Sequence, residues 1–234
     1  MAIPTLKVPR PAQDIPPLRE GDRLSRDEFE RRYEAMPEGT RAELVEGVVR
    51  MPSPVRQEQH GGPHFDFITW LGTYSVFTPG VQGGVSSTIR LDMDNEPQPD
   101  GVLFVGPGRG GNAFIDADGY IAGSPELGAE ISASTVRADM ENKFKAYRRN
   151  EIREYLIWRV EEKTFDWYVL RDSKYEALPP SAEGYLKSES FPGLWLDPAA
   201  LIRGDRARVH EVLQQGLRSP EHAEFVARLQ AAGA

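Results

Sequence analysis

The sequence of 234 residues contains no cysteine. This absence excludes disulfide bonds, thiolate metal sites, iron–sulfur clusters and cysteine nucleophiles. A metal site in this chain would instead use oxygen ligands, which suit hard cations such as Mg²⁺.

Long apolar runs are also missing. No stretch approaches the roughly 18 apolar residues that a membrane span needs, and the start of the chain lacks the apolar core of a signal peptide. We therefore expect a soluble, cytoplasmic protein with no membrane partner. The length fits one large domain or two small ones, and it is sufficient to bury a hydrophobic core.

Positive charge is in short supply, because 28 Lys and Arg residues face 36 Asp and Glu residues, for a net charge of −8. A protein that coats nucleic acid non-specifically needs dense Lys and Arg, so this class is disfavoured. An enzyme that meets nucleic acid through one local groove is not excluded. Residues 135–153 hold six basic and three acidic side chains, and this local excess of positive charge could receive a phosphate backbone.

The order of local patterns predicts one mixed fold. Five prolines within residues 1–20 indicate an extended arm. Helical and strand patterns then alternate, and two amphipathic helices close the chain. The expected helices cover about 25–36, 64–71, 139–150, 206–216 and 220–232, and the expected strands lie within 42–51, 81–105, 129–134 and 154–171. We predict an α/β or α+β fold, with an arm over 1–20, a domain over 21–205 and a helical extension over 206–234.

A glycine motif after one apolar strand does not indicate a nucleotide site. Gly106, Gly108 and Gly111 match the G-x-G-x-x-G pattern of dinucleotide-binding proteins. That motif requires a helix whose N-terminus meets the pyrophosphate. Further glycines and a proline over 112–129 leave no room for such a helix, so we expect a surface loop over 106–128.

Two acidic residues occupy strand positions. Asp100 precedes the apolar run GVLFV, and Glu130 lies within the strand AEISAS. A buried carboxylate is costly unless it is paired or binds a cation, and a divalent metal would relieve the repulsion between two carboxylates on adjacent strands. The alternative is that Asp100 caps a turn and Glu130 forms a salt bridge.

One lysine lies at the edge of a buried helical face. At 100° per residue, Met140, Phe144 and Tyr147 form the apolar stripe of the helix over 139–150. Lys143 falls beside this stripe, whereas Lys145 points to water. Lys143 can therefore lean toward the sheet and its carboxylates, or it can be a lysine whose stem covers apolar surface while its amine reaches solvent.

Three further residues are weaker candidates. Glu46 precedes the turn glycine of the first predicted hairpin, where it is either a third site carboxylate or an exposed turn residue. His60 and His64 are four residues apart and could bind zinc on a helix. The segment 61–63 (Gly-Gly-Pro) argues against one continuous helix there, and His64 on an apolar helical face is typical of a core residue.

The ordered set of motifs resembles a known family. The segments RAELVEGVVRMPSP, PQPDGVLFV, SPELGAEISAST and DMENKFKAYRRNEIREYLIW follow one another within residues 22–203. This combination is similar to the Uma-two family of restriction-endonuclease-like proteins, formerly a domain of unknown function, in the PD-(D/E)XK nuclease superfamily. The resemblance implies a restriction-endonuclease-like core, with a mixed central β-sheet flanked by α-helices.

The resemblance also implies the site residues. The "PD" pair of the family falls on residues 99–100, its strand acid on Glu130, its helical lysine on Lys143 and its early acid on Glu46. In this interpretation Asp100 and Glu130 hold one or two Mg²⁺ or Mn²⁺ ions with the backbone carbonyl of Ile131. Glu46 completes the shell, and Lys143 orients the attacking water or stabilises the transition state.

The function that follows is a metal-dependent endonuclease that hydrolyses phosphodiester bonds in DNA. Family members look dimeric, so a homodimer is expected. Two alternatives remain open. One is a catalytically silent binding or assembly protein on a nuclease scaffold, and the other is a metal-dependent phosphoesterase acting on a small substrate.

Overall fold

The computed structural model describes residues 15–52, 56–132 and 137–233. The predicted arm over 1–20 therefore lies mostly outside the described residues. A six-stranded sheet forms the centre of the molecule, in the order β11-β10-β9-β8-β5-β3. Its strands are β3 (Val81–Val85), β5 (Gly101–Val105), β8 (Leu127–Ser132), β9 (Glu154–Arg159), β10 (Thr164–Arg171) and β11 (Lys174–Ala177).

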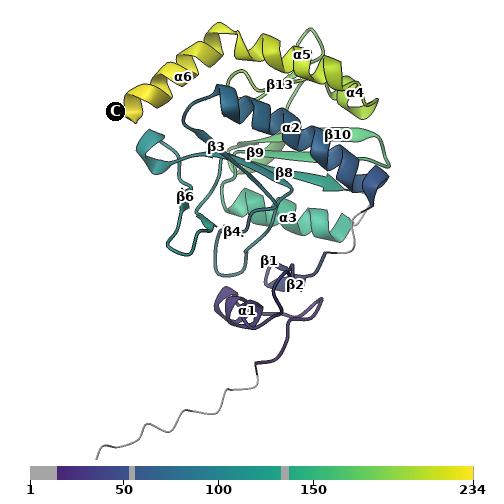
Figure 1. The fold of residues 1–234 in the computed structure, drawn as a ribbon, viewed down its shortest axis with the longest axis vertical. Coiled ribbons are helices and arrows are strands. Elements are labelled where there is room, and N and C mark those ends of the chain that lie inside the picture. Colours follow the sequence, from purple (N-terminus) through teal and green to yellow (C-terminus); the bar gives the residue numbers. More distant parts are fainter. Residues whose placement is uncertain (1–14, 53–55, 133–136, 234) are drawn as a thin grey trace, which may run out of the picture.

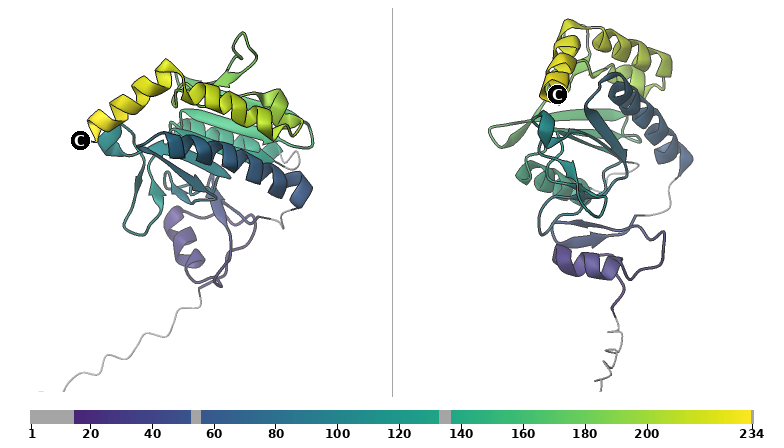
Figure 2. Two further views of the ribbon diagram at one scale, coloured as in Figure 1. Left: turned by 45° about the horizontal axis from the view of Figure 1, so that its top comes forward. Right: turned by 60° about the vertical axis from the view of Figure 1, so that its left-hand side comes forward.

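The sheet is mixed, because β8 and β9 are parallel whereas the other neighbouring strands are antiparallel. Helix α2 (Gly62–Phe77) covers one face and α3 (Arg137–Arg149) covers the other, as Figures 1 and 2 show. The predicted mixed sheet flanked by helices is thus confirmed.

Each face of the sheet has its own apolar core. On the α2 side, Trp70, Tyr74 and Trp167 are fully buried. The helices α5 (Arg206–Leu217) and α6 (Pro220–Ala232) add to this same core and extend the layer that α2 begins (Figure 1). On the α3 side, Tyr147 and Tyr155 stack edge to face. The division of the chain into an arm, a domain and a helical extension stays a prediction.

A small N-terminal layer lies beyond α3, at the end of the molecule opposite α5 and α6 (Figure 1). It consists of α1 (Arg26–Tyr33) and the hairpin β1 (Glu43–Val45) and β2 (Val48–Arg50). The hairpin turns at Glu46 and Gly47, both with positive φ, of 52° and 69°. Apolar side chains from both parts of this layer pack together, among them Phe29 and Leu44.

The segment expected as a surface loop over 106–128 contains more structure than predicted. It holds a 3₁₀ turn (Pro107–Arg109) and the strands β6 (Phe114–Ile115) and β7 (Ile121–Ala122). These strands join β4 (Ile89–Arg90) in a second sheet of order β4-β7-β6. Tertiary packing accounts for these strands, because the side chain of Ile121 packs with Val102 and Phe104 of β5.

The expected break between His60 and His64 is absent, so that prediction was wrong. One π-helical turn (Gln57–Gly61) leads directly into α2. The two glycines adopt ordinary right-handed helical angles. Pro63 lies at the junction, where the π-helical turn ends and α2 begins.

The C-terminal third adds three short elements: β12 (Leu186–Lys187), β13 (Trp195–Leu196) and α4 (Pro198–Ile202). In the part of the chain that the structure describes, no helix is long and apolar enough to cross a membrane.

Candidate metal centre

Two carboxylates meet where β5 begins and β8 ends. The strands are antiparallel with Gly101 opposite Ala129, which places Asp100 opposite Glu130. The backbone N–H of Ile131 donates to Asp100 Oδ2 at 2.7 Å. The side chains of Asp100 and Glu130 are only 16% and 14% exposed, so the structure brings these two predicted site residues together in a largely buried position.

Lys143 reaches this position from α3. Its Nζ lies 3.0 Å from Glu130 Oε1 and 3.0 Å from Glu43 Oε2. The Tyr147 hydroxyl, one helical turn further on, also donates to Glu130 Oε1 at 3.0 Å. Lys143 is therefore a buried ammonium held between two carboxylates. It is not a lysine whose amine extends into solvent.

Electrostatics in this cluster favour one extra positive charge. Burial, with the charges of Asp100 and Glu43, raises the pKa of Glu130 to about 8, although Lys143 opposes the shift. Burial lowers the pKa of Lys143, but the carboxylates of Glu130 and Glu43 outweigh it and raise that pKa above its usual range. One ammonium thus faces three acids, and a divalent cation would neutralise the excess negative charge.

Two histidines approach from the other side of the sheet. His60 Nε2 lies 3.2 Å from Asp100 Oδ1, and His60 Nδ1 lies 2.9 Å from the carbonyl oxygen of Ile131. His64 Nε2 lies 3.0 Å from the backbone oxygen of Asp100 and 4.0 Å from its Oδ1. Glycine at position 101 lets α2, which carries His64, pack closely over β5. A Cβ at this position would lie 2.8 Å from the side chain of Leu71 on α2.

The His60–Asp100 contact shifts both pKa values. The hydrogen bond to Asp100 raises the pKa of His60 against the effect of burial. Burial raises the pKa of Asp100, yet the hydrogen bonds from His60 and from the N–H of Ile131 hold it below its ordinary value. Sequence reasoning ranked the histidines low because it expected a broken helix. Their spacing of four residues, with proline in the first helical turn, was the signal that could have identified them.

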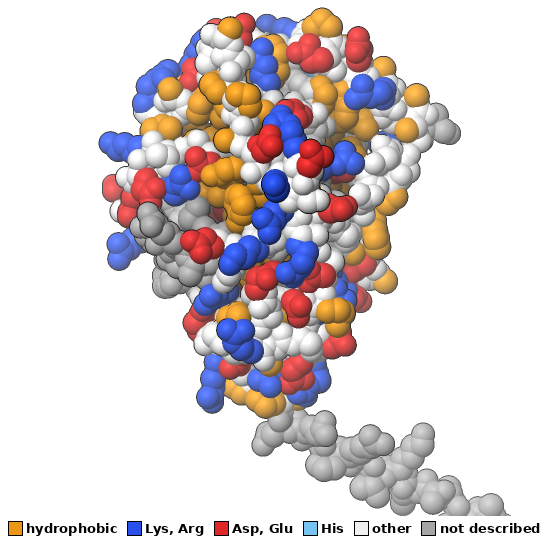
Figure 3. All heavy atoms as spheres, turned by 180° about the vertical axis from the view of Figure 1, so that it is seen from behind, with side chains coloured by type: hydrophobic (Ala, Val, Ile, Leu, Met, Phe, Trp, Pro, Cys, Tyr) orange, Lys and Arg blue, Asp and Glu red, His pale blue; other side chains and the backbone are white. Residues whose placement is uncertain are grey.

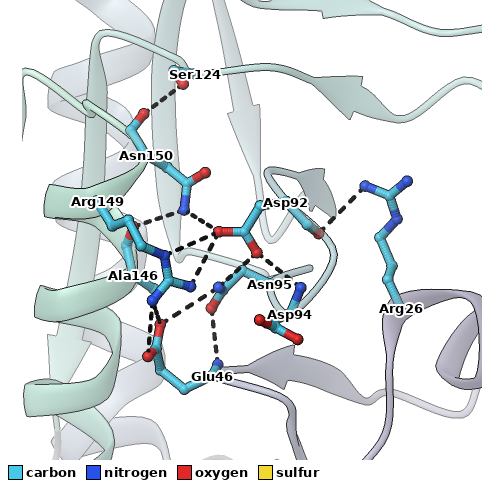
Figure 4. Close-up of polar contacts among 9 residues, drawn as sticks. All are labelled: Arg26, Glu46, Asp92, Asp94, Asn95, Ser124, Ala146, Arg149 and Asn150. Carbon is cyan, nitrogen blue, oxygen red and sulfur yellow. Dashed lines mark hydrogen bonds and ion pairs between the residues drawn. The ribbon is translucent and has the colours of Figure 1, made fainter.

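Glu46 lies in a different cluster, shown in Figure 4. Its carboxylate pairs with Arg149 at 2.9 Å, and its backbone N–H donates to Asn95 Oδ1 at 2.9 Å. Among the contacts of the described residues, none joins Glu46 to Asp100, Glu130 or Lys143.

Glu43 takes the position that sequence reasoning gave to Glu46. Glu43 and Val45 are two apart in β1 and so share one face of the strand. Val45 packs with Tyr147 under α3, so the same face carries the Glu43 carboxylate to Lys143. Glu46 follows the strand, in a turn with positive φ, where the alternation no longer holds. The period of two in β1 was the signal that could have identified Glu43.

The donors present fit a divalent cation. Asp100 accepts the Ile131 backbone N–H with Oδ2, so its Oδ1 makes no backbone hydrogen bond here and can bind an ion. Glu130 supplies a second buried carboxylate. The Ile131 carbonyl lies beside Asp100 and keeps one lone pair beyond its contact with His60. Hard oxygen donors of this kind suit Mg²⁺ and Mn²⁺.

Comparison with known proteins agrees with the fold described above. The model of the Uma2 (Uma-two) family, described as "Putative restriction endonuclease", matches residues 26–199. The chain belongs to the Uma2 family. The Uma2 match contains the whole cluster from Glu43 to Tyr147 and ends before α5 and α6.

The fold is also similar to a solved structure, described as a "putative nuclease belonging to DUF820" from Anabaena variabilis ATCC 29413. The TM-score is 0.52 at 14% sequence identity, and the match covers 74% of this chain and 97% of the other. At this identity the similarity shows the shared fold of the Uma2 chain and not its activity. A search of curated proteins finds no match.

Proposed function

We propose that this protein is a metal-dependent endonuclease that hydrolyses phosphodiester bonds in DNA. The observation that carries the proposal is the position of Lys143, a buried ammonium between Glu130 and Glu43 at the strand ends where Asp100 also lies. Membership of a family described as "Putative restriction endonuclease" supports nuclease chemistry.

The metal site in this proposal consists of Asp100, Glu130 and the backbone carbonyl of Ile131, and the metal is Mg²⁺ or Mn²⁺. A bound ion would polarise the scissile phosphate and lower the pKa of the attacking water. Glu46 is not included, because Arg149 and Asn95 engage it elsewhere.

Lys143 provides positive charge that does not depend on a bound ion. An ammonium has three N–H donors, and two of them are used by Glu43 and Glu130. The third can donate to the attacking water or to a phosphate oxygen whose negative charge grows in the transition state. Glu43 and Tyr147 act as positioning residues, since one holds Lys143 and the other holds Glu130.

DNA would approach a surface of mixed charge. The outer side of α3 exposes Lys145 and Arg148, which can contact phosphates. Seen from behind, the molecule shows basic and acidic side chains interleaved without a large patch of one sign (Figure 3). We therefore expect weak, salt-sensitive binding of DNA. Homodimer formation stays a prediction, and sedimentation velocity tests it.

The direct test is cleavage of supercoiled and linear DNA with Mg²⁺, with Mn²⁺ or with EDTA. The wild type is expected to cleave only with metal. Asp100→Asn and Lys143→Met are expected to lower the rate by about 10²-fold or more. Arg228→Met, at an exposed position of α6 outside this surface, is the control and should keep the wild-type rate.

The same assay separates the alternatives. Equal cleavage by the wild type, Asp100→Asn and Lys143→Met would reject these roles. Metal-dependent hydrolysis of bis(p-nitrophenyl) phosphate without cleavage of DNA or RNA would favour the phosphoesterase. If no substrate is hydrolysed and calorimetry detects no Mn²⁺ binding at millimolar concentration, the catalytically silent scaffold is favoured.

A further inference from the structure

Three potential ligands converge beside the carboxylate pair. One nitrogen of His60, one nitrogen of His64 and one oxygen of Asp100 all lie within 4.8 Å of one another. Two donors bound at about 2.1 Å to one octahedral ion lie roughly 3.0 Å apart when adjacent and 4.2 Å apart when opposite. The distance of 3.2 Å from Asp100 Oδ1 to His60 Nε2 falls within this range.

The contact between His60 and Asp100 sets an imidazole nitrogen against a carboxylate oxygen. His60 Nδ1 lies 2.9 Å from the carbonyl oxygen of Ile131. A carbonyl only accepts hydrogen bonds, so Nδ1 carries the proton in that contact. In a neutral ring Nε2 then presents a lone pair to Asp100 Oδ1 at 3.2 Å. The two lone pairs repel unless a second proton or a metal ion lies between them.

The orientation of His60 is that of a metal ligand. Histidines that bind metals usually donate their other ring N–H to a carboxylate or a backbone carbonyl, which fixes the tautomer and aims the free nitrogen. The Ile131 carbonyl does this for His60. His64 projects from the first turn of α2, four residues later, and its ring centroid is 5.3 Å from that of His60. Its Nε2 lies 3.0 Å from the Asp100 carbonyl oxygen and therefore carries a proton, so His64 supports Asp100 and is not a ligand through this nitrogen.

From this geometry we infer that His60 Nε2 joins Asp100 Oδ1 as a ligand of the divalent ion, in place of the Ile131 carbonyl that accepts its Nδ1–H, and that the centre therefore prefers Mn²⁺ and other transition metals to Mg²⁺. Imidazole suits first-row transition metals, whereas Mg²⁺ selects oxygen ligands and retains its waters. This replaces the all-oxygen site expected from the lack of cysteine. The inference rests on the proposed function only in treating this cluster as the metal centre.

The test is pulsed electron paramagnetic resonance of the full chain loaded with Mn²⁺, because coordinated imidazole produces ¹⁴N modulation of the electron spin echo. The wild type is expected to show this modulation. His60→Gln should abolish it, whereas His64→Gln should keep it, because His64 Nε2 donates to the Asp100 carbonyl. The chain has four histidines, and His210 on α5 provides the matched control, so His210→Gln should leave the spectrum unchanged.

A competition titration gives a second measurement. His60→Gln is expected to weaken Mn²⁺ binding about tenfold or more while changing Mg²⁺ binding much less. Wild-type protein that binds Mn²⁺ without ¹⁴N modulation would overturn the inference, and so would an equal loss of affinity for both ions. The wild-type result does not depend on whether a variant folds.

The outcomes also separate this inference from the proposed function. DNA cleavage that requires Asp100, together with a nitrogen-free Mn²⁺ spectrum, would overturn the histidine ligand and support the nuclease. Nitrogen modulation without hydrolysis of any phosphodiester would support the ligand and overturn the nuclease.

Discussion

Replacing Lys143 with methionine tests whether this side chain neutralises two buried carboxylates. Methionine keeps most of the side-chain volume, so the change removes charge without opening a large cavity. Lys143, Glu43 and Glu130 are only 11–17% exposed, and solvent therefore screens their two ion pairs weakly.

The expected loss in the free energy of unfolding at pH 7 is about 3 kcal/mol. Removing one partner of a buried ion pair typically costs about 3–5 kcal/mol, because the other charge stays buried and unpaired. The lower end applies here. Lys143 lowers the pKa of Glu130, so removing Lys143 pushes that pKa further above about 8. Glu130 is then protonated at pH 7, which leaves Glu43 as the principal unpaired charge.

Urea unfolding followed by tryptophan fluorescence measures this loss, since Trp70, Trp158 and Trp167 are buried. A loss of 3 kcal/mol shifts the midpoint by about 1 M at a slope of about 3 kcal/mol/M. The matched control Lys145→Met should stay within about 0.5 kcal/mol of the wild type.

A double variant tests the cause of the loss. Lys143→Met combined with Glu43→Gln removes the unpaired charge, so it should recover about 1 kcal/mol relative to Lys143→Met alone. If Lys143→Met unfolds within about 0.5 kcal/mol of the wild type, the reasoning about a buried, charge-neutralising lysine is refuted.

Three further predictions concern acids outside the proposed centre. Burial and the neighbouring Glu30 raise the pKa of Glu96 to about 8 from 4.5; its contribution to stability is therefore complete below pH 4.5 and is lost as the pH rises through 8. Glu96→Gln should flatten this decline in unfolding curves recorded from pH 5 to 8, and an unchanged slope would contradict the assignment. Glu46→Gln should leave Mn²⁺ affinity in calorimetry unchanged and lower stability by at most about 1 kcal/mol, because its partner Arg149 is exposed; a large loss of affinity would return Glu46 to the site. Glu154 is fully buried, and its carboxylate accepts the Trp167 indole N–H at 2.7 Å and further hydrogen bonds from the turn at 188–190. Glu154→Ala should lower the free energy of unfolding by about 3 kcal/mol in denaturant titrations, and Glu154→Gln by less, whereas equal losses would show that hydrogen bonding to this acid is unimportant.

Local periodicity was sufficient to place part of the cluster. The alternation of side chains in β8 put Glu130 on the face opposite Ile131, and the helical wheel separated Lys143 from Lys145. The structure shows Lys143 buried against Glu130 while Lys145 is exposed. These placements depend on the period of one element at a time, which a sequence displays directly.

The remaining placements depend on how elements meet. Glu46 and Glu43 are both acids near one hairpin, and the positive φ at Glu46 directs its side chain toward Arg149. His60 reaches Asp100 only because α2 packs closely over Gly101. The strands within 106–128 form because apolar side chains of β5 pack against Ile121. Each of these depends on contacts between residues that are distant in the chain.

The central claim is that a divalent cation binds where Asp100 meets Glu130. A crystal soaked with Mn²⁺, with data collected near the manganese absorption edge, tests it most directly. The account predicts an anomalous difference peak within bonding distance of Asp100 Oδ1, and Lys143 Nζ should still contact the Glu130 carboxylate. A soaked crystal with no such peak, or with its peak at Glu46 instead, would contradict the account.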